Sequence, residues 1–385
     1  MPQFEGKLNS NEIFAALYNM IISQEVFANN INDTYADLVD RMRVDGSLYG
    51  DQKLYYSTDV LKSVEWGGDS EALNLLQLHR PKDPKVQSIE LNVFRQISLT
   101  VDDYLSKRAW GDEYAFSQFN SVMLGWIRET KKVYDSTTMN TYIGTTQTNV
   151  GKQTQELTLP TDSDAESQAR LQAQFIAYTL SNILVDVRDI TRDYNDNKFL
   201  RSFSPKNLIV VWNSIWKNKI TKLDLPTIFH KDELFDKVDE YTLPSRYFGK
   251  VNTAGGTVGA TNTTIRSLYE MDYTVSEVVT HVFPGDLLPA NAVYEANNTY
   301  TEDASIICKI IHDRGIPYMS AFEVATSFFN AKSLTENRYL TFGHNTLEYL
   351  ENFPFITLRA TTAAAAANTT TAKTTTTKTT TTKTA

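Results

Sequence analysis

The feature that most constrains the fold of this 385-residue chain is a long alternation of apolar and polar residues at positions 87–101. Because successive side chains of a β-strand point to opposite faces, the alternation predicts one strand of about fifteen residues, roughly 50 Å long. A usual strand has about 5–6 residues. Arg95 interrupts an apolar face that otherwise consists of Ile89, Leu91, Val93, Ile97, Leu99 and Val101.

The segment 54–66 is the expected antiparallel partner of this strand, with a turn at residues 67–69 and a polar stretch up to Pro84 between them. An isolated two-stranded ribbon is marginally stable in water, so such an arm cannot bury its apolar face alone. We therefore expect a neighbouring subunit to stabilise the arm over residues 54–101. The alternative is an ordinary strand within one domain core.

Two segments before and after this arm have the periodicity of amphipathic helices. Residues 10–31 follow a possible cap at Ser10 and are too short and interrupted to cross a membrane. A second helix is expected from Asp112 toward Tyr142, which corresponds to about 30 residues and roughly 45 Å. We expect the first of these helices to dock on another surface.

A third helix is expected after Pro160, where Ser163 and Glu166 have the spacing of a capping box. Apolar residues then recur with helical spacing, which is typical of a face that packs on a core. These residues are Ala169, Ala173, Ile176, Leu180, Ile183, Val187 and Ile190.

The apolar run from Leu208 to Trp212 predicts a strand that is buried on both faces. Catalytic groups often follow such a strand, but the residues here are Asn213, Ser214, Trp216, Lys217 and Asn218. Short apolar runs at 278–283, 306–311, 339–342 and 355–358 predict further strands, and residues 320–332 predict a short helix.

Two segments have the composition of irregular structure. Residues 249–264 are rich in Gly, Thr and Asn, which predicts a mobile loop. From Thr361 onward the chain is almost entirely Ala, Thr and Lys, so we expect a disordered tail that cannot form a core and is dispensable for folding.

Charge and cysteine content exclude several classes of protein. The net charge is −9, and three lysines in the tail have no acidic neighbour there, so the rest of the chain carries −12. A nucleic-acid reader usually has the opposite sign on its folded domain. The single cysteine, Cys308, excludes an internal disulfide and a multi-cysteine metal site, and it is expected to be a buried, inert thiol. The N-terminus lacks the pattern of a signal peptide.

No motif in the sequence predicts catalysis, a cofactor or a metal ion. The phosphate-loop, HExxH, GxSxG and CxxC patterns are absent, and the five histidines are scattered. Asp193, Asn195 and Asn197 resemble half of a calcium loop, but Lys198 stands where that loop needs glycine. Asp189 and Asp193 share a helix face as a possible carboxylate pair, but Arg188 and Arg192 flank them, which favours an exposed ion-pair face.

The order of these parts resembles the major capsid proteins of tailed bacteriophages, the Hong Kong 97 type shell fold. Two segments carry the resemblance most closely. RQISLTVDDYLSKRAWGDEYAFSQFNSVMLGWI resembles the outgoing strand of the extended E-loop and the spine helix, and NLIVVWNSIWKNKITKLDLPTIF resembles a strand of the axial (A) domain of small podophage, phi29-like relatives.

The resemblance implies an α+β fold with a defined division of the chain. The expected parts are an N-terminal arm (1–50), an E-loop β arm (51–108), a peripheral (P) domain with the spine helix (109–204), an A-domain (205–290), returning strands (291–360) and the tail (361–385). The subunit-contact candidates are Leu91, Val93, Arg95, Ile97, Trp66, Gly255, Gly256 and Gly259.

The function that the resemblance implies is structural, with no catalytic residue and no cofactor. Copies of the chain would assemble as hexamers and pentamers in the host bacterial cytoplasm, into an icosahedral virion shell. Packaged double-stranded DNA, without sequence-specific contact, and scaffolding, portal and decoration proteins are the further expected partners, and no membrane is expected. Two alternatives stay open: an encapsulin-like compartment shell, and an enzyme with a dispersed active site.

Overall fold

The structure is a computed structural model that describes residues 35–46, 52–63, 78, 80–102, 113–146, 151–221, 238–261 and 264–361. The expected helix at 10–31, Trp66, the turn at 67–69, the cap at Asp112 and the tail beyond Thr361 lie outside the described residues. No described helix is long and apolar enough to cross a membrane.

A five-stranded sheet forms the centre of the fold, in the order β5-β18-β15-β6-β7. β15 is antiparallel to both of its neighbours, whereas the two outer strands run parallel to theirs. The strands are β5 (Thr154–Thr158), β6 (Leu208–Asn213), β7 (Asp239–Leu243), β15 (Ile306–His312) and β18 (Phe355–Thr361).

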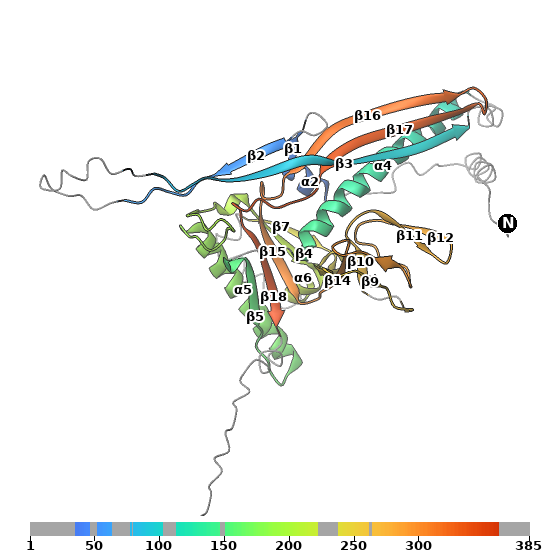
Figure 1. Ribbon diagram of the computed structural model, residues 1–385. Helices are drawn as coiled ribbons and strands as arrows, with labels where there is room; N and C mark the ends of the chain where they lie inside the picture. Colours follow the sequence, from blue (N-terminus) through green and yellow to red (C-terminus); the bar gives the residue numbers. More distant parts are fainter. Residues whose placement is uncertain are drawn as a thin grey trace, which may run out of the picture.

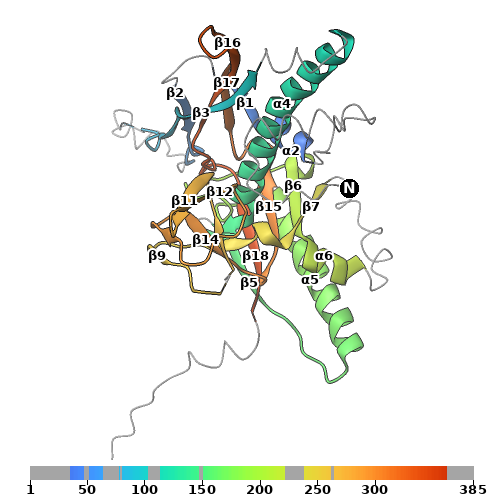
Figure 2. The same cartoon turned by 90° about the vertical axis from the view of Figure 1, so that its right-hand side faces the viewer.

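Helices cover both faces of the central sheet, which explains why every residue of β6 is buried. Leu208, Val210 and Trp212 pack with α5 (Ala165–Arg188) and α6 (Ser214–Thr221) on one face (Figure 2). Ile209 and Val211 pack with α2 (Ala36–Met42) and the end of α4 on the other face. The expected two-sided burial of this strand is confirmed.

The expected helix after Pro160 is confirmed as α5, with one correction at its start. Asp164, not Ser163, is the N-cap, and its carboxylate accepts a hydrogen bond of 2.9 Å from the Ser167 amide. Ile190 lies beyond the helix end and is 64% exposed. The buried residues of the helix are Ala173, Ile176, Ala177, Leu180, Ile183, Leu184 and Val187.

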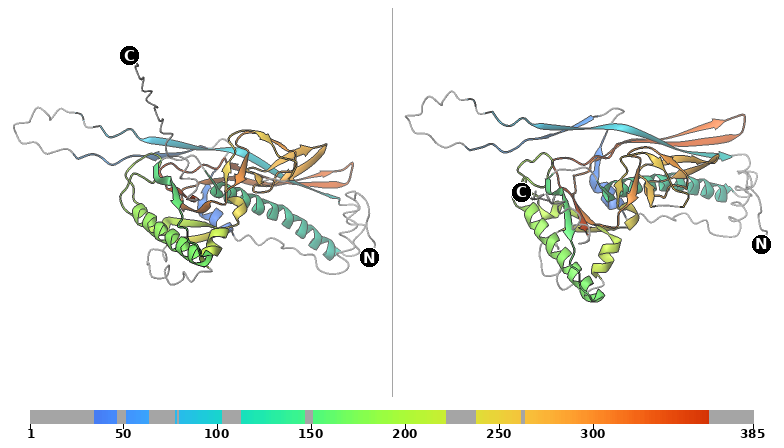
Figure 3. Two further views of the ribbon diagram at one scale, coloured as in Figure 1. Left: turned by 90° about the horizontal axis from the view of Figure 1, so that it is seen from below. Right: turned by 60° about the horizontal axis from the view of Figure 1, so that its bottom comes forward.

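The long helix expected from Asp112 toward Tyr142 is confirmed as α4 (Glu113–Gly144), which has 32 residues. It leaves the core and runs beneath a second sheet of order β1-β16-β17-β3-β2, so that both extend past the central sheet (Figures 1 and 3). The strands of this sheet are β1 (Arg43–Asp45), β2 (Gln52–Ser57), β3 (Lys85–Asp102), β16 (Tyr318–Asn330) and β17 (Thr335–Asn345).

The long strand expected at 87–101 is confirmed as the 18-residue β3, but its pairing differs from the expected two-stranded arm. β2 pairs with β3 only over 85–90. From Leu91 to Asp102, β3 instead pairs with β17, which is more than 230 residues distant in sequence. Most of β3 is therefore one strand of a wider sheet.

The short helix expected at 320–332 is wrong, because this segment belongs to β16. It forms an antiparallel hairpin with β17, with pairs from Ser320 and His344 at one end to Asn330 and Thr335 at the other. Alanine, glutamate and phenylalanine permit a helix, but the ladder with β17 satisfies the backbone of the whole segment and decides its structure.

A third region consists of short strands beside the end of α4. A sheet of order β10-β14-β8-β4 adjoins the hairpin β11–β12 and the pair β13–β9. These strands are β4 (Thr145–Thr146), β8 (Gly249–Val251), β9 (Gly256–Thr257), β10 (Ile265–Ser267), β11 (Met271–Val275), β12 (Val278–Val282), β13 (Val293–Tyr294) and β14 (Thr299–Glu302).

The glycine-rich segment 249–264, expected to be a mobile loop, is only partly irregular over its described residues. It contributes β8 and β9, and Val258 is 2% exposed in a small core with Tyr273 and Leu288. Strand pairing and one buried apolar side chain therefore fix parts of residues 249–261. Short 3-10 turns at Gly151–Gln153, Pro205–Asn207 and Ser245–Tyr247 complete the described elements.

Candidate subunit-contact surfaces and a polar cavity

The apolar stripe of β3 faces the interior of the same chain. Leu91 is 3% exposed and packs with Ile89, Met319 and Leu350. Ile97 is half-buried opposite Leu340 of β17, and Val93 lies on the wall of a cavity. The chain itself thus covers much of the stripe that was expected to need a neighbouring subunit.

The opposite face of the arm carries apolar side chains that the described residues leave exposed. Tyr56 of β2 lies opposite Val86 of β3, and Leu54 lies on the same face two residues away. Leu54 is 47% exposed, Tyr56 67% and Val86 51%. We call these three residues the outer arm patch. The sequence signal that could have revealed them is that positions 54, 56 and 86 are all apolar. These positions lie outside the long alternation at 87–101.

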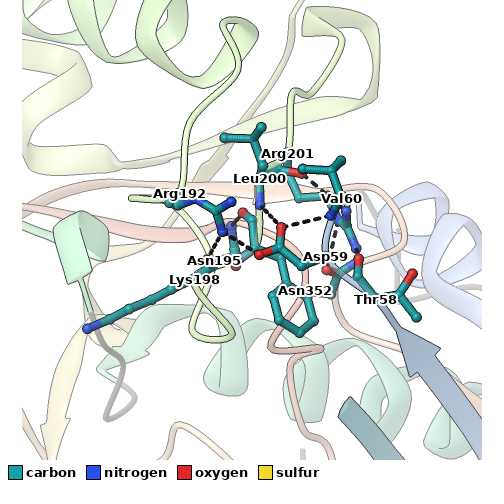
Figure 4. A network of polar contacts seen from close by, with 10 residues as sticks. Thr58, Asp59, Val60, Arg192, Asn195, Lys198, Leu200, Arg201 and Asn352 are labelled. Carbon is teal, nitrogen blue, oxygen red and sulfur yellow. Dashed lines mark hydrogen bonds and ion pairs between the residues drawn. The ribbon is translucent and has the colours of Figure 1, made fainter. Parts of the chain in front are cut away.

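A cluster of polar contacts holds the base of the arm, directly after β2 (Figure 4). The Asp59 carboxylate accepts hydrogen bonds from Arg192 at 2.6 Å, the Val60 amide at 3.0 Å and the Leu200 amide at 3.1 Å. The hydrogen bond from Arg192, followed by that from the Leu200 amide, lowers the pKa of Asp59 from its usual 3.8 to about 2.

A second arginine supports the same arm base. Arg201 donates hydrogen bonds to the Thr58 carbonyl oxygen at 2.6 Å and to the Asn352 side chain at 3.0 Å (Figure 4). The sequence predicts that the acids at 189 and 193 form an ion-pair face with their flanking arginines. Arg192 instead pairs with Asp59, and Asp193 pairs with Lys152 at 2.7 Å.

The glycine candidates lie in a different region from the arm candidates (Figures 1 and 2). Gly256 of β9 pairs with Tyr294 of β13, and a Cβ atom there would lie 2.9 Å from the tyrosine hydroxyl. A Cβ atom on Gly255 would lie 2.9 Å from the Tyr294 carbonyl oxygen. The backbone of β13 therefore leaves no room for a Cβ atom at Gly255, whereas at Gly256 only the tip of the Tyr294 side chain would have to move. Gly259 is exposed.

A cavity of about 670 Å³ lies where α4, β3 and β17 meet the third region. Arg95 projects into its wall and donates a hydrogen bond of 3.0 Å to the backbone oxygen of Glu270. The carboxylate of Glu270 is 3.0 Å from the His281 ring. The polar and charged lining residues are Arg95, Thr138, Thr146, Thr154, Lys250, Thr253, Glu270, Asn297, His344, Thr346 and Arg359.

A buried histidine forms one side of this cavity. Nε2 of His344 lies 2.6 Å from the Tyr134 hydroxyl, and Nδ1 lies 2.8 Å from the Asn345 carbonyl oxygen. Since that carbonyl oxygen only accepts, Nδ1 carries the proton and Nε2 accepts from the tyrosine. Burial lowers the pKa of His344 below its usual 6.5, which favours this neutral form.

The central sheet contains a fully buried lysine, Lys309. Its Nζ donates to the Thr145 carbonyl oxygen at 3.0 Å and to the Thr357 hydroxyl at 2.9 Å. Burial lowers the pKa of Lys309 from 10.5 to about 7. The neighbouring Cys308 is buried as expected, and burial raises the pKa of its thiol. Within the described ranges, no cluster of three or more His, Cys, Asp or Glu side chains could hold a metal ion.

Comparisons of the whole fold identify its class. No protein-family model and no curated protein matches the sequence. A chain in the capsid structure of Staphylococcus phage Andhra is similar with a TM-score of 0.59 at 8% identity, over 88% of this chain and 87% of that chain. The chain has the capsid fold of tailed phages.

A second solved structure is similar in fold over nearly the whole length of both chains. A chain in the structure described as head fiber and inner core protein gp22 of native bacteriophage P68 matches with a TM-score of 0.56 at 11% identity, over 93% of this chain and 94% of that chain. The α+β, Hong Kong 97-like fold class expected from the sequence is thereby confirmed.

Proposed function

We propose that this chain is the major capsid protein of a tailed phage and assembles into the icosahedral shell of the virion. The observation that carries the proposal is the capsid fold, which extends over 88% of this chain in one solved structure and 93% in another. The role is structural rather than enzymatic, and the chain's main partners are copies of itself.

We propose the division of the chain that the resemblance to capsid proteins implies. We assign the E-loop to residues 51–108, the P-domain to 109–204, the A-domain to 205–290 and the returning strands to 291–360. In support, the pair β2–β3 extends past the core, and α4 has the length of a spine helix (Figure 3).

The outer arm patch supports a contact between copies in the E-loop. Leu54, Tyr56 and Val86 stand on an extended arm and would each contribute about 1 kcal/mol if a neighbour buried their exposed half. Leu91 and Ile97 would then act indirectly, because they fix the arm to its own subunit from the inner side.

Packaged double-stranded DNA is the proposed content of the shell, held without sequence-specific contact. The charge of the chain without its tail, −12, supports this, because an acidic wall repels a polyanion and leaves the genome free to be packed and released. Scaffolding, portal and decoration proteins are further proposed partners.

The test is direct observation of the purified recombinant chain by negative-stain microscopy, with a nuclease-protection assay on material from infected or co-expressing cells. Closed particles that protect double-stranded DNA support the proposal. Particles that enclose protein instead would support an encapsulin-like compartment, and a monodisperse monomer of about 44 kDa under all assembly conditions would contradict a shell role.

A further inference from the structure

The cavity beside α4 has one buried hydroxyl without a hydrogen-bond partner and one arginine without a carboxylate partner among the described residues. Thr138 is 9% exposed, lines the cavity, and its hydroxyl makes no hydrogen bond there. Arg95 is half-buried, and no described carboxylate lies within ion-pair distance of its guanidinium. Arg95 donates to the Glu270 backbone oxygen and lies 5.9 Å from the centre of the Tyr134 ring, but neither partner carries a negative charge. Because buried polar groups are normally hydrogen-bonded and buried charges paired, the cavity has a place for a further acceptor with a negative charge.

The charges around the cavity indicate what would complete it. The carboxylate of Glu270 is engaged by His281, and Arg359 is engaged by Asp303 at 2.5 Å. Arg95 and the exposed Lys250 remain as cations without an acidic partner among the described residues. A cation-rich cavity on an acidic chain is complementary to a carboxylate from another copy of that chain.

The tip of the hairpin β11–β12 has the complementary chemistry. Its two turn residues, Ser276 and Glu277, have φ angles of 49° and 69°, a left-handed conformation that hairpin turns usually give to Asn or Gly. The next two residues, Val278 and Val279, are 64% and 63% exposed. The tip therefore combines the Glu277 carboxylate, two exposed valines and an unfavourable backbone conformation. Such strained conformations are typical of functional sites.

The hairpin cannot place this tip in the cavity of its own subunit. Glu270 stands on the cavity wall, and the five-residue strand β11 begins at the next residue. At roughly 3.4 Å per residue, the strand carries the tip about 17 Å away from Glu270. Figures 1 and 3 show the hairpin projecting from the third region.

We propose that residues 277–279 of one copy insert into the cavity of a second copy, with the Glu277 carboxylate facing Arg95 and Lys250 and the valines against the aromatic wall. That wall includes Tyr134, Tyr142 and Tyr269. The inference rests on the proposed self-assembly and adds the residues of one contact. A tip that enters a different surface of its neighbour makes a head-to-tail interface, which forms a ring when the rotation between copies closes and a filament when it does not.

Paired cysteines test this contact. Glu277→Cys and Lys250→Cys are both at exposed positions, and the native Cys308 is buried. Cysteines bond only when their Cα atoms come within about 7 Å, so the double variant should give a ladder of disulfide-linked multimers under mild oxidation. The matched control combines Glu277→Cys with Lys332→Cys, which is exposed on the turn between β16 and β17.

A ladder specific to the 277/250 pair supports the inference. No ladder, or an equal ladder from the control pair, overturns it. The ladder does not require closed particles. Its absence is therefore distinguishable from failure of the proposed function, because that failure would show as wild-type protein that forms no particles.

A charge swap provides the second test on the same residues. Glu277→Lys and Lys250→Glu should each lower the yield of particles at least tenfold, and the double swap should recover most of that yield. Circular dichroism should be unchanged in all three, because both positions are exposed. Single variants that assemble as wild type, or a swap that recovers nothing, would contradict the proposed contact.

Discussion

The guanidinium of Arg192 lies 2.6 Å from the carboxylate of Asp59, although 133 residues separate them in sequence (Figure 4). The side chain of Asp59 is only 8% exposed. This ion pair joins the end of β2 to the segment that follows α5. It therefore fixes the base of the arm to the body of the subunit.

Asp59→Asn should loosen the arm base without unfolding the subunit. Because the pKa of Asp59 is lowered from 3.8 to about 2, its ionised form stabilises the fold above about pH 4, and this contribution is lost as the pH falls through 2. We expect severalfold faster hydrogen exchange in residues 58–63 at pH 7, measured by mass spectrometry. The control is Asp83→Asn, an exposed position. Equal hydrogen exchange in both variants would contradict the role of the Asp59–Arg192 ion pair in fixing the arm base.

Lys309 should make the stability of the subunit depend on pH. Its pKa falls from 10.5 in the unfolded chain to about 7 in the fold, so between these values the unfolded state binds one more proton. Stability should then rise with pH, by about 1.4 kcal/mol per pH unit relative to Lys309→Met. Urea unfolding between pH 7.5 and 9.5 measures this difference. Lys332→Met is the exposed control, and parallel curves for wild type and Lys309→Met would disprove the expectation.

The two faces of the arm should respond differently to substitution. Leu54→Asp with Tyr56→Asp should leave the fold intact and prevent assembly, because both side chains are exposed in the subunit. Leu91→Asp should destabilise the subunit itself by about 3 kcal/mol, since it places a charge among buried apolar residues. Circular dichroism with particle counting separates the effects. Normal particles from the outer double variant would exclude the outer arm patch as a contact.

The elements predicted correctly are those that local sequence determines. The alternation in β3, the helical spacing in α5 and the double-sided apolar run of β6 each report burial directly. β16 was mistaken for a helix because its identity depends on a ladder with β17, which local composition does not reveal. The pairing of β3 with β17 was missed for the same reason.

The candidate sites were harder to predict because distant segments build them. Arg95, Tyr134, Lys250 and His344 meet at one cavity from four separate parts of the chain. The one local signal was Arg95, which interrupts an apolar stripe without a neighbouring acid in sequence. The outer arm patch was not predicted because its three apolar residues form no long alternation. The long alternation on β3 marks the face that the subunit buries itself.

DNA binding tests the proposed acidic wall. A chain truncated after Thr361 keeps the complete β18 and loses the three tail lysines, which leaves a charge of −12. We expect it to stay soluble and to bind duplex DNA only weakly at low salt, while any stronger binding by the full chain depends on the tail. Titration by fluorescence anisotropy measures both. Sub-micromolar DNA binding by the truncated chain would contradict the proposed acidic wall.

The central claim is that copies of this chain form a closed shell, and electron microscopy of the purified full-length protein tests it most directly. The account predicts closed, hollow particles of uniform size, with the arm of one subunit resolved on the surface of its neighbour. A protein that stays monomeric across salt, pH and crowding conditions, with its arm patch exposed and its cavity empty, would contradict it.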